Sequence, residues 1–388
     1  MSSETSIAVI GAGMVGLAVA DALCRAGASV TVLDRGALAG GTTNNTFSWL
    51  NATSETEDES YHRLNAAGAA AWRALAREGG EVVIGLHPCG MIEWVDGANA
   101  DARGDLERRA ERLATWGYPA RRVDRHDLEA MEPHMAFPPG AMGIHAFADA
   151  WLDPPKAASF LAERVRQHGG RILEGCAARR ISREKGAIVA VETDEGPISA
   201  GRVVIAAGPD TPSVLAHMSG NESFRTRTRI NSVPGAIIRT PPTAPFHWVR
   251  SIVYSEHHGS LHIRPAANGG LLLGADDVDE WIAKGHDEDL MKDIEKHLLK
   301  RARMLIPRLP VHLWIGKCKW RVGVRPMPSD GHSIVGSVPG DPGLYVAVTH
   351  SGITLAPIIG QCLSELILSG KTPSLIEPFG YGRFQRPA

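Results

Sequence analysis

The sequence has few of the features that mark secreted, metal-binding or nucleic-acid-binding proteins. Its five cysteines are scattered and no two form a C-x-x-C pair, which disfavours both a disulfide framework and a zinc site. Lysine plus arginine total 41 and aspartate plus glutamate 43, and this formal net charge of −2 predicts neither a nucleic-acid nor an anionic-membrane partner. The first six residues are polar, so we expect no signal peptide and a cytoplasmic protein with reduced thiols.

Long hydrophobic runs are also absent from the sequence. No apolar stretch reaches the roughly 18 residues that span a bilayer, and Asp21 and Arg25 interrupt the apolar segment 14–26. We therefore expect no transmembrane segment. A hydrophobic content of 44% and a charged content of 22% are typical of a globular protein, and the length of 388 residues favours two domains.

Residues 6–35 carry the clearest motif. An apolar strand leads into a glycine turn, an alanine-rich helix and a second strand that ends at Asp34. The turn has the pattern G-x-G-x-x-G, formed by Gly11, Gly13 and Gly16. Such glycines allow a tight turn, close approach to a pyrophosphate and close helix–strand packing, while the helix N-terminus attracts phosphate. Asp34 lies where an acidic side chain binds ribose hydroxyls, so the segment predicts a dinucleotide site.

A polar loop rich in glycine, threonine, asparagine and serine follows Asp34. A chain that leaves the second strand passes beside the bound pyrophosphate, where short hydroxyl side chains can reach phosphate oxygens. The candidate donors are Thr42, Thr43, Thr46 and Ser48. An ordinary surface linker explains the same composition equally well.

The strand–glycine–helix pattern returns twice further along the chain. Residues 202–207 are almost wholly apolar and run into Gly208, as in a buried parallel strand whose end approaches a ligand. Residues 344–348 form a similar strand, followed by a helix over 355–369. Asp153 is expected to cap a further helix whose first positions hold two prolines.

Two other blocks, 81–144 and 221–324, lack this pattern and predict a second domain. The first block should open with a short strand at 82–86. The second alternates like antiparallel strands, beginning with 225–239, and contains a long helix over 287–305.

Three histidines in the second block raise the question of a metal site. They are His257, His258 and His262. No carboxylate or cysteine joins them at ligand spacing, so histidines on a strand surface are the favoured interpretation and no metal is expected.

Three later segments, VVIAAG, RPMPSDG and THSGITLAPIIG, follow the glycine motif in this order. With it, they resemble the flavin-dependent D-amino acid oxidase superfamily, which includes glycine oxidase, sarcosine oxidase and D-amino acid dehydrogenases. The resemblance implies a discontinuous α/β FAD-binding domain, Rossmann-like and of the glutathione-reductase type, plus an α+β substrate domain with a mostly antiparallel sheet. The implied FAD-binding domain comprises 1–80, 145–220 and 325–388, and the implied substrate domain 81–144 and 221–324.

The resemblance also assigns cofactor contacts residue by residue. The implied FAD-binding residues are Gly11, Gly13, Met14, Val15, Gly16, Asp34, Arg35, Thr42, Thr43, Thr46, Phe47, Ser48, Trp49, Ala178, Ala207, Gly208, Gly352, Ile353 and Thr354. Asp34 stands where the family usually has glutamate, and Ala178 where it commonly has valine. Sarcosine oxidases attach FAD through a cysteine, but the matching position here is Gly323 and Cys318 is out of register. We therefore predict dissociable, non-covalent FAD.

Arg325 and His350 are the implied catalytic residues. In the family, the matching arginine binds the substrate carboxylate through its planar fork; a structural arginine paired with Asp330 is the alternative. His350 is expected either to contact substrate or to cap the turn. The implied reaction passes a hydride from the C–N carbon of an amino acid or secondary amine to flavin N5, with the imine hydrolysed by water and the flavin reoxidised by O2 or an electron carrier. The oligomeric state is left open.

Two other functions remain compatible with the glycine motif. An NAD(P)-dependent dehydrogenase uses the same fingerprint, but it leaves the RPMPSDG and HSGIT segments unexplained. A catalytically silent flavin-binding protein is the other alternative, and the presence of Arg325 argues against it.

Overall fold

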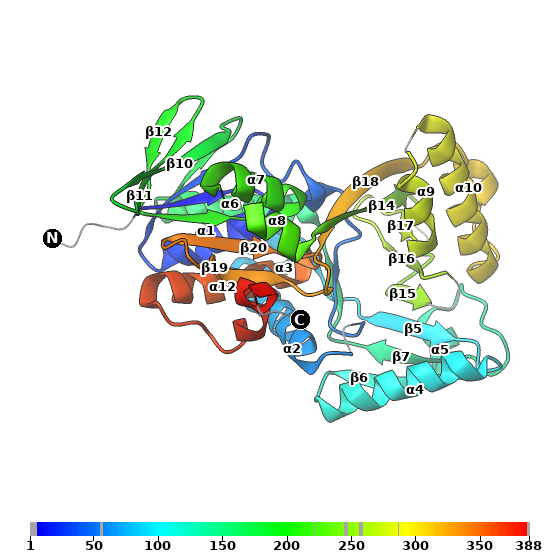
Figure 1. Ribbon diagram of the computed structural model, residues 1–388. Helices are drawn as coiled ribbons and strands as arrows, with labels where there is room; N and C mark the ends of the chain where they lie inside the picture. The colour runs from blue at the N-terminus through cyan, green and yellow to red at the C-terminus, as the bar shows by residue number, and fades with distance from the viewer. Residues whose placement is uncertain are drawn as a thin grey trace.

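Two large sheets organise the chain (Figure 1). A computed structural model describes residues 6–54, 57–220, 222–243, 247–255, 259–285 and 287–385. A six-stranded sheet takes strands from the beginning, middle and end of the chain, and an eight-stranded sheet lies beside it in the view of Figure 1. Elements far apart in the sequence therefore meet in both sheets.

The six-stranded sheet has the order β19-β20-β13-β1-β2-β9. Its strands are β1 (Ser6–Ile10), β2 (Ser29–Leu33), β9 (Arg171–Leu173), β13 (Arg202–Ile205), β19 (Ile334–Ser337) and β20 (Leu344–Val348). All neighbours pair in parallel except β19 and β20. Central β1 is paired on both sides, with Val9 opposite Val32 and Val204. Helices cover both faces of such a sheet, which explains why its inner strands are apolar throughout.

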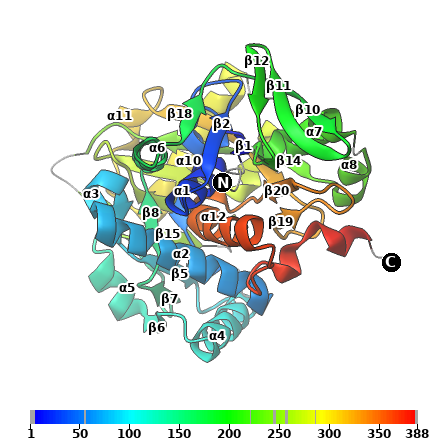
Figure 2. The ribbon, with the colours of Figure 1, turned by 90° about the vertical axis from the view of Figure 1, so that its left-hand side faces the viewer.

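Four helices pack on or near this sheet: α1 (Met14–Arg25), α2 (Glu59–Gly79), α6 (Pro154–Gln167) and α12 (Gly352–Ser369). Figure 2 shows α1 and α12 near the N-terminal strand. The two helices touch closely, since a Cβ at Gly360 would lie 2.4 Å from the carbonyl oxygen of Ala18. Asp153 precedes α6 as predicted, but its side chain accepts no capping hydrogen bond.

Helix α12 alone among the described residues is long and apolar enough to cross a membrane by length and composition. However, 67% of its apolar window is buried inside the structure, against α1 and α2. The core helix of a globular protein passes the same test, so the finding is weak evidence for a membrane span.

The eight-stranded sheet has the order β18-β14-β17-β16-β15-β5-β7-β6, and only the β15–β5 pair is parallel. Its strands are β5 (Met91–Val95), β6 (Ala120–Asp124), β7 (Met142–Ala146), β14 (Asn231–Arg239), β15 (Ile252–Ser255), β16 (Leu261–Pro265), β17 (Leu271–Gly274) and β18 (Lys319–Met327). Helix α10 (Glu288–Leu305) packs on β16 and β17 through a buried stripe that includes Ile294 and Leu298. The opposite face carries His262 and Arg264, which contact Phe47.

Smaller elements complete the fold. Three short strands form one sheet: β3 (Trp49–Leu50), β4 (Leu86–His87) and β8 (Ala150–Leu152). A meander contains β10 (Ala178–Glu184), β11 (Ala187–Thr193) and β12 (Gly196–Ser199). The remaining α-helices are α3 (Glu81–Ile84), α4 (Ala100–Thr115), α5 (Arg125–Met131), α7 (Thr211–Ser219), α8 (Glu222–Thr228), α9 (Asp279–Ile282) and α11 (Val311–Trp314).

The predicted strand over 82–86 is wrong. Residues 81–84 form the single helical turn α3, and only Leu86 and His87 pair as a strand. Glycines with positive φ bound this turn, Gly80 at +87° and Gly85 at +74°. The two glycines turn the chain on either side of this segment. The β-branched Val82 is therefore 80% exposed and does not enter a sheet.

The strand predicted over 225–239 begins later than expected. Residues 222–228 are helical, and β14 starts at Asn231. Phe224 is buried against Tyr381, and the Thr228 hydroxyl donates to the carbonyl of Phe224. Burial of one helical face outweighs the alternating pattern here, because tertiary packing overrides local propensity.

Candidate cofactor and substrate site

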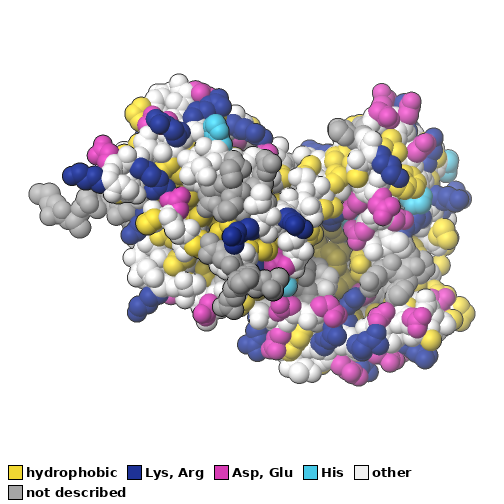
Figure 3. Space-filling view, in the orientation of Figure 1, with side chains coloured by type: hydrophobic (Ala, Val, Ile, Leu, Met, Phe, Trp, Pro, Cys, Tyr) yellow, Lys and Arg dark blue, Asp and Glu magenta, His cyan; other side chains and the backbone are white. Residues whose placement is uncertain are grey.

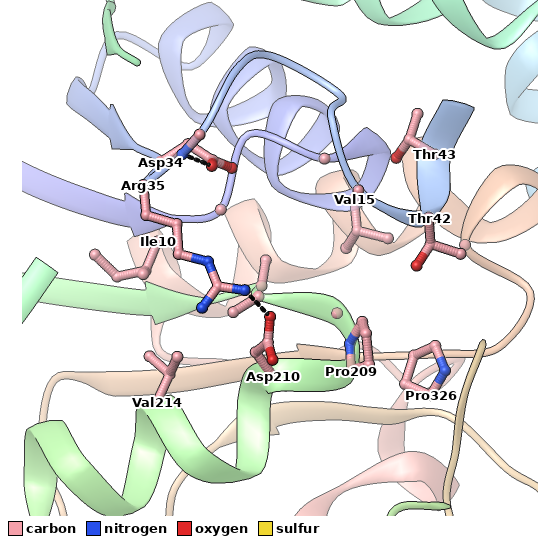
Figure 4. A pocket seen from close by; sticks show the side chains of 18 of the residues that line it. Ile10, Val15, Asp34, Arg35, Thr42, Thr43, Pro209, Asp210, Val214 and Pro326 are labelled. Carbon is pink, nitrogen blue, oxygen red and sulfur yellow. Dashed lines mark hydrogen bonds and ion pairs between the residues drawn. The ribbon is translucent and has the colours of Figure 1, made fainter. Parts of the chain in front are cut away.

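A cavity of about 820 Å³ lies where the strands of the six-stranded sheet end. Ile10, Leu33 and Ala206 line it, each at or just after the carboxyl end of a parallel strand. Ligands of open α/β sheets bind at this edge, and the volume falls within the range typical of ligand pockets. Figure 4 shows Asp34 and Arg35 toward one end of the site and Thr42 and Pro326 toward the other.

Most of the predicted cofactor residues meet in this cavity. Those that line it are Gly11, Gly13, Met14, Val15, Asp34, Arg35, Thr42, Thr43, Thr46, Ala178, Ala207, Gly208, Gly352 and Ile353, together with Arg325 and His350. Those outside its lining are Gly16, Phe47, Ser48, Trp49 and Thr354.

The three glycines of the first motif have different surroundings. Gly11 has a φ of +111°, and a Cβ there would lie 2.4 Å from the carbonyl oxygen of Ala206. A Cβ at Gly16 would lie 1.9 Å from the carbonyl oxygen of Gly11, so this position serves packing between helix and turn. At Gly13 the nearest atom is the Thr43 hydroxyl oxygen, at 3.4 Å. Gly13 therefore leaves space on the cavity side, as close approach of a phosphate requires.

Asp34 braces the glycine turn as well as lining the cavity. One carboxylate oxygen accepts the N–H of Ala12 at 2.7 Å, and the other accepts the N–H of Gly36 at 2.8 Å. A carboxylate has about four acceptor positions, so positions remain for ribose hydroxyls. Sequence reasoning did not identify this bracing role.

Arg35 turns toward Asp210 across the cavity wall (Figure 4). Their ion pair measures 2.7 Å, with side-chain exposures of 73% and 48%. Asp210 was not among the predicted site residues, although it stands only two positions after Gly208. The pair connects the end of β2 to the segment that follows β13.

The polar loop after β2 is part of the site and not a detached linker. The Thr43 hydroxyl accepts the N–H of Met14 at 3.0 Å, and the Thr42 hydroxyl donates to the carbonyl of Val324 at 2.6 Å. These two threonines therefore connect the start of α1 to β18. Both remain in the cavity lining.

Residues 47–49 lie outside the cavity lining and pack behind the residues that form it. Ser48 adopts a positive φ of +61°, and its hydroxyl donates to the carbonyl of Leu152 at 2.8 Å. The indole N–H of Trp49 donates to Asp149, and its carbonyl accepts the hydroxyl of Thr354. The position of this segment therefore depends on α12 and on residues 149–152, which hydrogen-bond to its backbone and side chains.

Arg264 holds the same segment from the eight-stranded sheet. It is 4% exposed, and its Nε donates to the carbonyl of Phe47 at 2.6 Å. Its guanidinium lies 4.2 Å from the ring centroid of Trp151, within cation–π range. Burial lowers the pKa of Arg264 to about 9, so the side chain stays cationic at neutral pH.

His350 has partners on both ring nitrogens. Its Nε2 lies 3.0 Å from the carbonyl oxygen of Gly331 and 3.0 Å from the hydroxyl of Tyr61, and its Nδ1 lies 3.2 Å from the hydroxyl of Ser351. Burial lowers the pKa of His350 to about 4, so the ring is neutral at pH 7. A neutral ring with Nε2–H donating to Gly331 satisfies this geometry. The side chain connects the start of α12 to the preceding loop.

Arg325 pairs with acids that the sequence analysis did not identify. Its Nη2 donates to Asp279, and its Nη1 lies 4.0 Å from Asp276. Asp330, the expected alternative partner, instead accepts from Arg383 at 2.7 Å. Burial raises the pKa of Asp279 to about 6, and Arg325 opposes this shift.

Gly323, which matches the position of the attachment cysteine in sarcosine oxidases, cannot accept a side chain in this backbone. A Cβ at Gly323 would lie 2.0 Å from the carbonyl oxygen of Asn45. All five cysteines are free, and burial raises the pKa of the Cys318 thiol to about 12. The close contact between β18 and the loop leaves no room for a cysteinyl bond at this position.

No group of three or more histidine, cysteine, aspartate or glutamate side chains among the described residues is arranged to hold a metal ion. His257 and His258 lie outside the described residues. His262 packs edge-on against the ring of Phe47, with centroids 4.4 Å apart.

Comparison with known proteins identifies the cofactor. A model of the FAD dependent oxidoreductase family matches residues 6–366. The chain belongs to this family. It is therefore an FAD-dependent oxidoreductase, and this favours FAD over NAD(P) as the dinucleotide that the glycine motif predicts.

Individual relatives match along almost the whole chain. Glycine oxidase from Geobacillus kaustophilus is 25% identical over 99% of this chain and 98% of its own. Its crystal structure superposes with a TM-score of 0.80 at 23% identity, covering 98% and 99% of the two chains. L-proline dehydrogenase from P. horikoshii gives a TM-score of 0.84 at 20% identity, over 100% of this chain and 99% of that one. These structures share the fold.

The residues present fit FAD. The cavity joins a glycine turn open at Gly13, the acid Asp34 and the N-terminus of α12 at Gly352. These groups suit a pyrophosphate, a ribose and the electron-rich edge of a flavin ring, respectively.

Proposed function

We propose that the protein oxidises the C–N bond of an amino acid or of a secondary amine that bears a carboxylate. The observation that carries this proposal is Arg325, a guanidinium that lines the same cavity as the glycine motif and the start of α12. Arginine matches a carboxylate through its planar fork. The similar proteins named glycine oxidase and L-proline dehydrogenase support the assignment to amino acids.

The residues of this chain would divide the work of the reaction. FAD, when bound, supplies the acceptor for the substrate hydride at its N5 atom. Arg325 would hold the carboxylate and so direct the carbon next to nitrogen toward the cofactor. The backbone N–H groups at Gly352 and Ile353 begin α12, where they would stabilise negative charge.

We assign His350 a positioning role. Its two ring nitrogens are engaged by Gly331, Tyr61 and Ser351, and it is neutral at pH 7. A substrate with a neutral amine needs no protein base, because only the hydride leaves its carbon and water then hydrolyses the imine. The cavity can therefore act through orientation and electrostatics alone.

We further propose that the two sheets have separate tasks. Residues 1–80, 145–220 and 325–388 would hold FAD, and residues 81–144 and 221–324 would shape the substrate side. Strand β18 connects the two, since it pairs with β14 and also brings Arg325 and Pro326 into the cavity. The space-filling view is hollowed between the two halves of the molecule, with hydrophobic side chains in the hollow (Figure 3).

Anaerobic reduction of the flavin tests the proposal. The purified protein is mixed, without oxygen, with a panel of glycine, N-methyl, cyclic and D-amino acids, and with matched amines that lack the carboxylate. We expect at least one carboxylate-bearing compound to bleach the flavin absorbance and its carboxylate-free analogue to react much more slowly. Reduction by dithionite but by no member of the panel would contradict the proposal.

A further inference from the structure

One long segment of the chain contains no acidic residue. From Lys296 to Ser329, a stretch of 34 residues, there is no aspartate or glutamate, and there are nine lysines and arginines. The whole chain has a formal charge of −2, so the summed charge conceals this local excess. The expectation that no anionic membrane is a partner rested on that sum.

The structure places much of this charge on the surface, without counter-charges. The cations Lys300, Arg303, Arg308, Lys317 and Lys319 are all exposed. Within the described ranges none of these five forms an ion pair with a carboxylate. Other cations of the segment are paired, as Arg301 is with Asp277. The unpaired group lies at the end of α10, in the segments on either side of α11 and at the first residue of β18.

A neighbouring strand adds another cation at the same edge. Arg239 at the end of β14 stands directly opposite Lys319 in the antiparallel ladder. Like charges in directly opposed positions destabilise a strand pair. No described carboxylate pairs with either side chain. A bound anionic partner would relieve this repulsion.

Apolar side chains are exposed among these cations. Met304 is 68% exposed, Leu313 53%, Ile315 49% and Trp320 40%. They are half of the eight large hydrophobic side chains that are exposed in the described part of the chain. Lone exposed apolar residues need no explanation, but four within 17 positions beside unpaired cations form a pattern.

We propose that this basic–apolar face, defined by Arg308, Leu313, Ile315, Lys317, Lys319 and Trp320, binds the surface of an anionic lipid bilayer. Lys319 and Trp320 point to opposite sides of β18, the outermost strand of its sheet, so the bilayer meets this strand edge-on and reaches both side chains. Lysine and arginine are attracted to acidic headgroups, while tryptophan and aliphatic side chains enter the interfacial region. A nucleic acid would engage the cations and leave Leu313 and Ile315 in water. A bilayer surface engages both kinds of side chain, and the charge of the face is complementary to it.

The position of the face connects it to the cofactor site. Figure 2 shows α11 and β18 at the same edge of the molecule. From Trp320 to Arg325 the strand advances five residues, about 17 Å at the usual rise of a β-strand. Binding would therefore bring the cavity end at Arg325 close to the membrane surface. This inference does not depend on which substrate is oxidised.

Vesicle flotation tests the proposal with the FAD-loaded, full-length protein. Vesicles of phosphatidylcholine alone are compared with vesicles that contain 30% phosphatidylglycerol, about a third of the lipid, at low and high salt. We expect binding to the anionic vesicles only, weakened at least tenfold by about 0.5 M salt. The double variant K317E/K319E should bind at least tenfold more weakly, and L313Q/I315Q should also lose binding.

The helical turn α3 supplies a matched control. Val82 and Val83 are 80% and 59% exposed, but the sequence beside them carries Glu78 and Glu81, and among the described residues Lys156 is the one lysine found next to the turn, at Gly85. The variant V82Q/V83Q should therefore bind like the unmodified protein, with flavin content and melting temperature confirming that every variant is folded. Absence of binding to anionic vesicles overturns the proposal. So does binding that L313Q/I315Q leaves intact while soluble polyglutamate abolishes it, because that result identifies an acidic protein as the partner.

Discussion

Asp279 accepts a hydrogen bond from Nη2 of Arg325 and so occupies one of the two terminal nitrogens of the guanidinium group. A carboxylate oxygen of Asp276 lies 4.0 Å from Nη1, the other terminal nitrogen. The arginine that we propose for substrate binding is therefore already held by carboxylates of its own chain. A substrate carboxylate must share this guanidinium with Asp279 or displace it.

Replacing Arg325 by methionine should weaken the binding of a carboxylate substrate by roughly 30- to 150-fold. Loss of a charge-assisted, two-pronged contact costs about 2–3 kcal/mol, and methionine keeps much of the side-chain volume. The measurement is the concentration dependence of anaerobic flavin reduction. Unchanged affinity in R325M, with FAD still bound, would refute the assignment of the carboxylate subsite.

The variant D279N should bind carboxylate substrates more tightly than the unmodified protein, by about three- to tenfold. Asparagine removes the internal negative charge that competes for the fork, and near a protein surface such a charge is worth on the order of 1 kcal/mol. The more exposed Asp276 provides the control, and D276N should have a smaller effect. Equal or weaker binding by D279N would mean that Asp279 orients the arginine instead of competing with it.

Acid should strengthen the binding of a simple carboxylate. Burial raises the pKa of Asp279 to about 6, so the group is ionised at pH 8 and mostly protonated at pH 5. Protonation weakens its hold on Arg325, which leaves the guanidinium to an added carboxylate such as benzoate. The dissociation constant, read from the flavin spectrum, should fall from pH 8 to pH 5, and this trend should vanish in D279N. A pH-independent dissociation constant in the unmodified protein would contradict the model of competition.

The buried Asp149 should make the fold less stable as pH rises toward neutrality. Burial raises its pKa from 3.8 to about 7, although Tyr118, Trp49 and Thr53 donate hydrogen bonds to it. A raised carboxyl pKa gives stability that is complete below the unfolded pKa and is lost as pH rises through the folded pKa. Relative to D149N, the free energy of unfolding should therefore decline between about pH 4 and pH 7, by up to about 4 kcal/mol. Parallel pH curves for the two proteins would disprove this.

Two alanine substitutions should separate cofactor binding from packing. At Gly13 a Cβ meets no protein atom closer than 3.4 Å, so G13A should keep the melting temperature of the apoprotein and lose FAD affinity, by at least about tenfold. At Gly16 a Cβ would lie 1.9 Å from the carbonyl oxygen of Gly11, so G16A should destabilise the apoprotein itself by about 1–3 kcal/mol or more. Thermal melts without FAD and titrations with FAD measure the two effects. Similar behaviour of the two variants would argue against the division of roles.

The glycine motif and the strands around it were predictable because local sequence determines them. Apolar strands, glycine spacing and helix periodicity all act within about 20 residues, and β1, α1 and β2 lie where the pattern predicted. The predicted strand at 82–86 failed because Gly80 and Gly85 turn the chain, which outweighs the β-branched pair between them.

The partners of Arg325 could not be read in the same way. Asp279 lies 46 positions earlier in an acidic run, DDVDE, that is typical of a solvated turn. Only the register of β14 against β18, with Val233 opposite Arg325, brings that turn beside the arginine. Asp330 is close in sequence, yet Arg383 from the C-terminal region takes its carboxylate. Which of several aspartates pairs with an arginine therefore depends on the tertiary structure, because their side chains are chemically the same.

The order of the strands in the six-stranded sheet has a consequence for synthesis of the protein. Strand β1 emerges from the ribosome long before its parallel neighbour β13, which begins at residue 202, and the helix start at Gly352 comes later still. At about 5–20 residues per second, roughly 20 to 70 s separate the first glycine turn from the last wall of the cavity. The nascent chain carries a complete phosphate-binding turn without the groups that close around the rest of FAD. Capture of the cofactor therefore has to wait until Gly352 has been synthesised, long after the glycine turn itself has emerged.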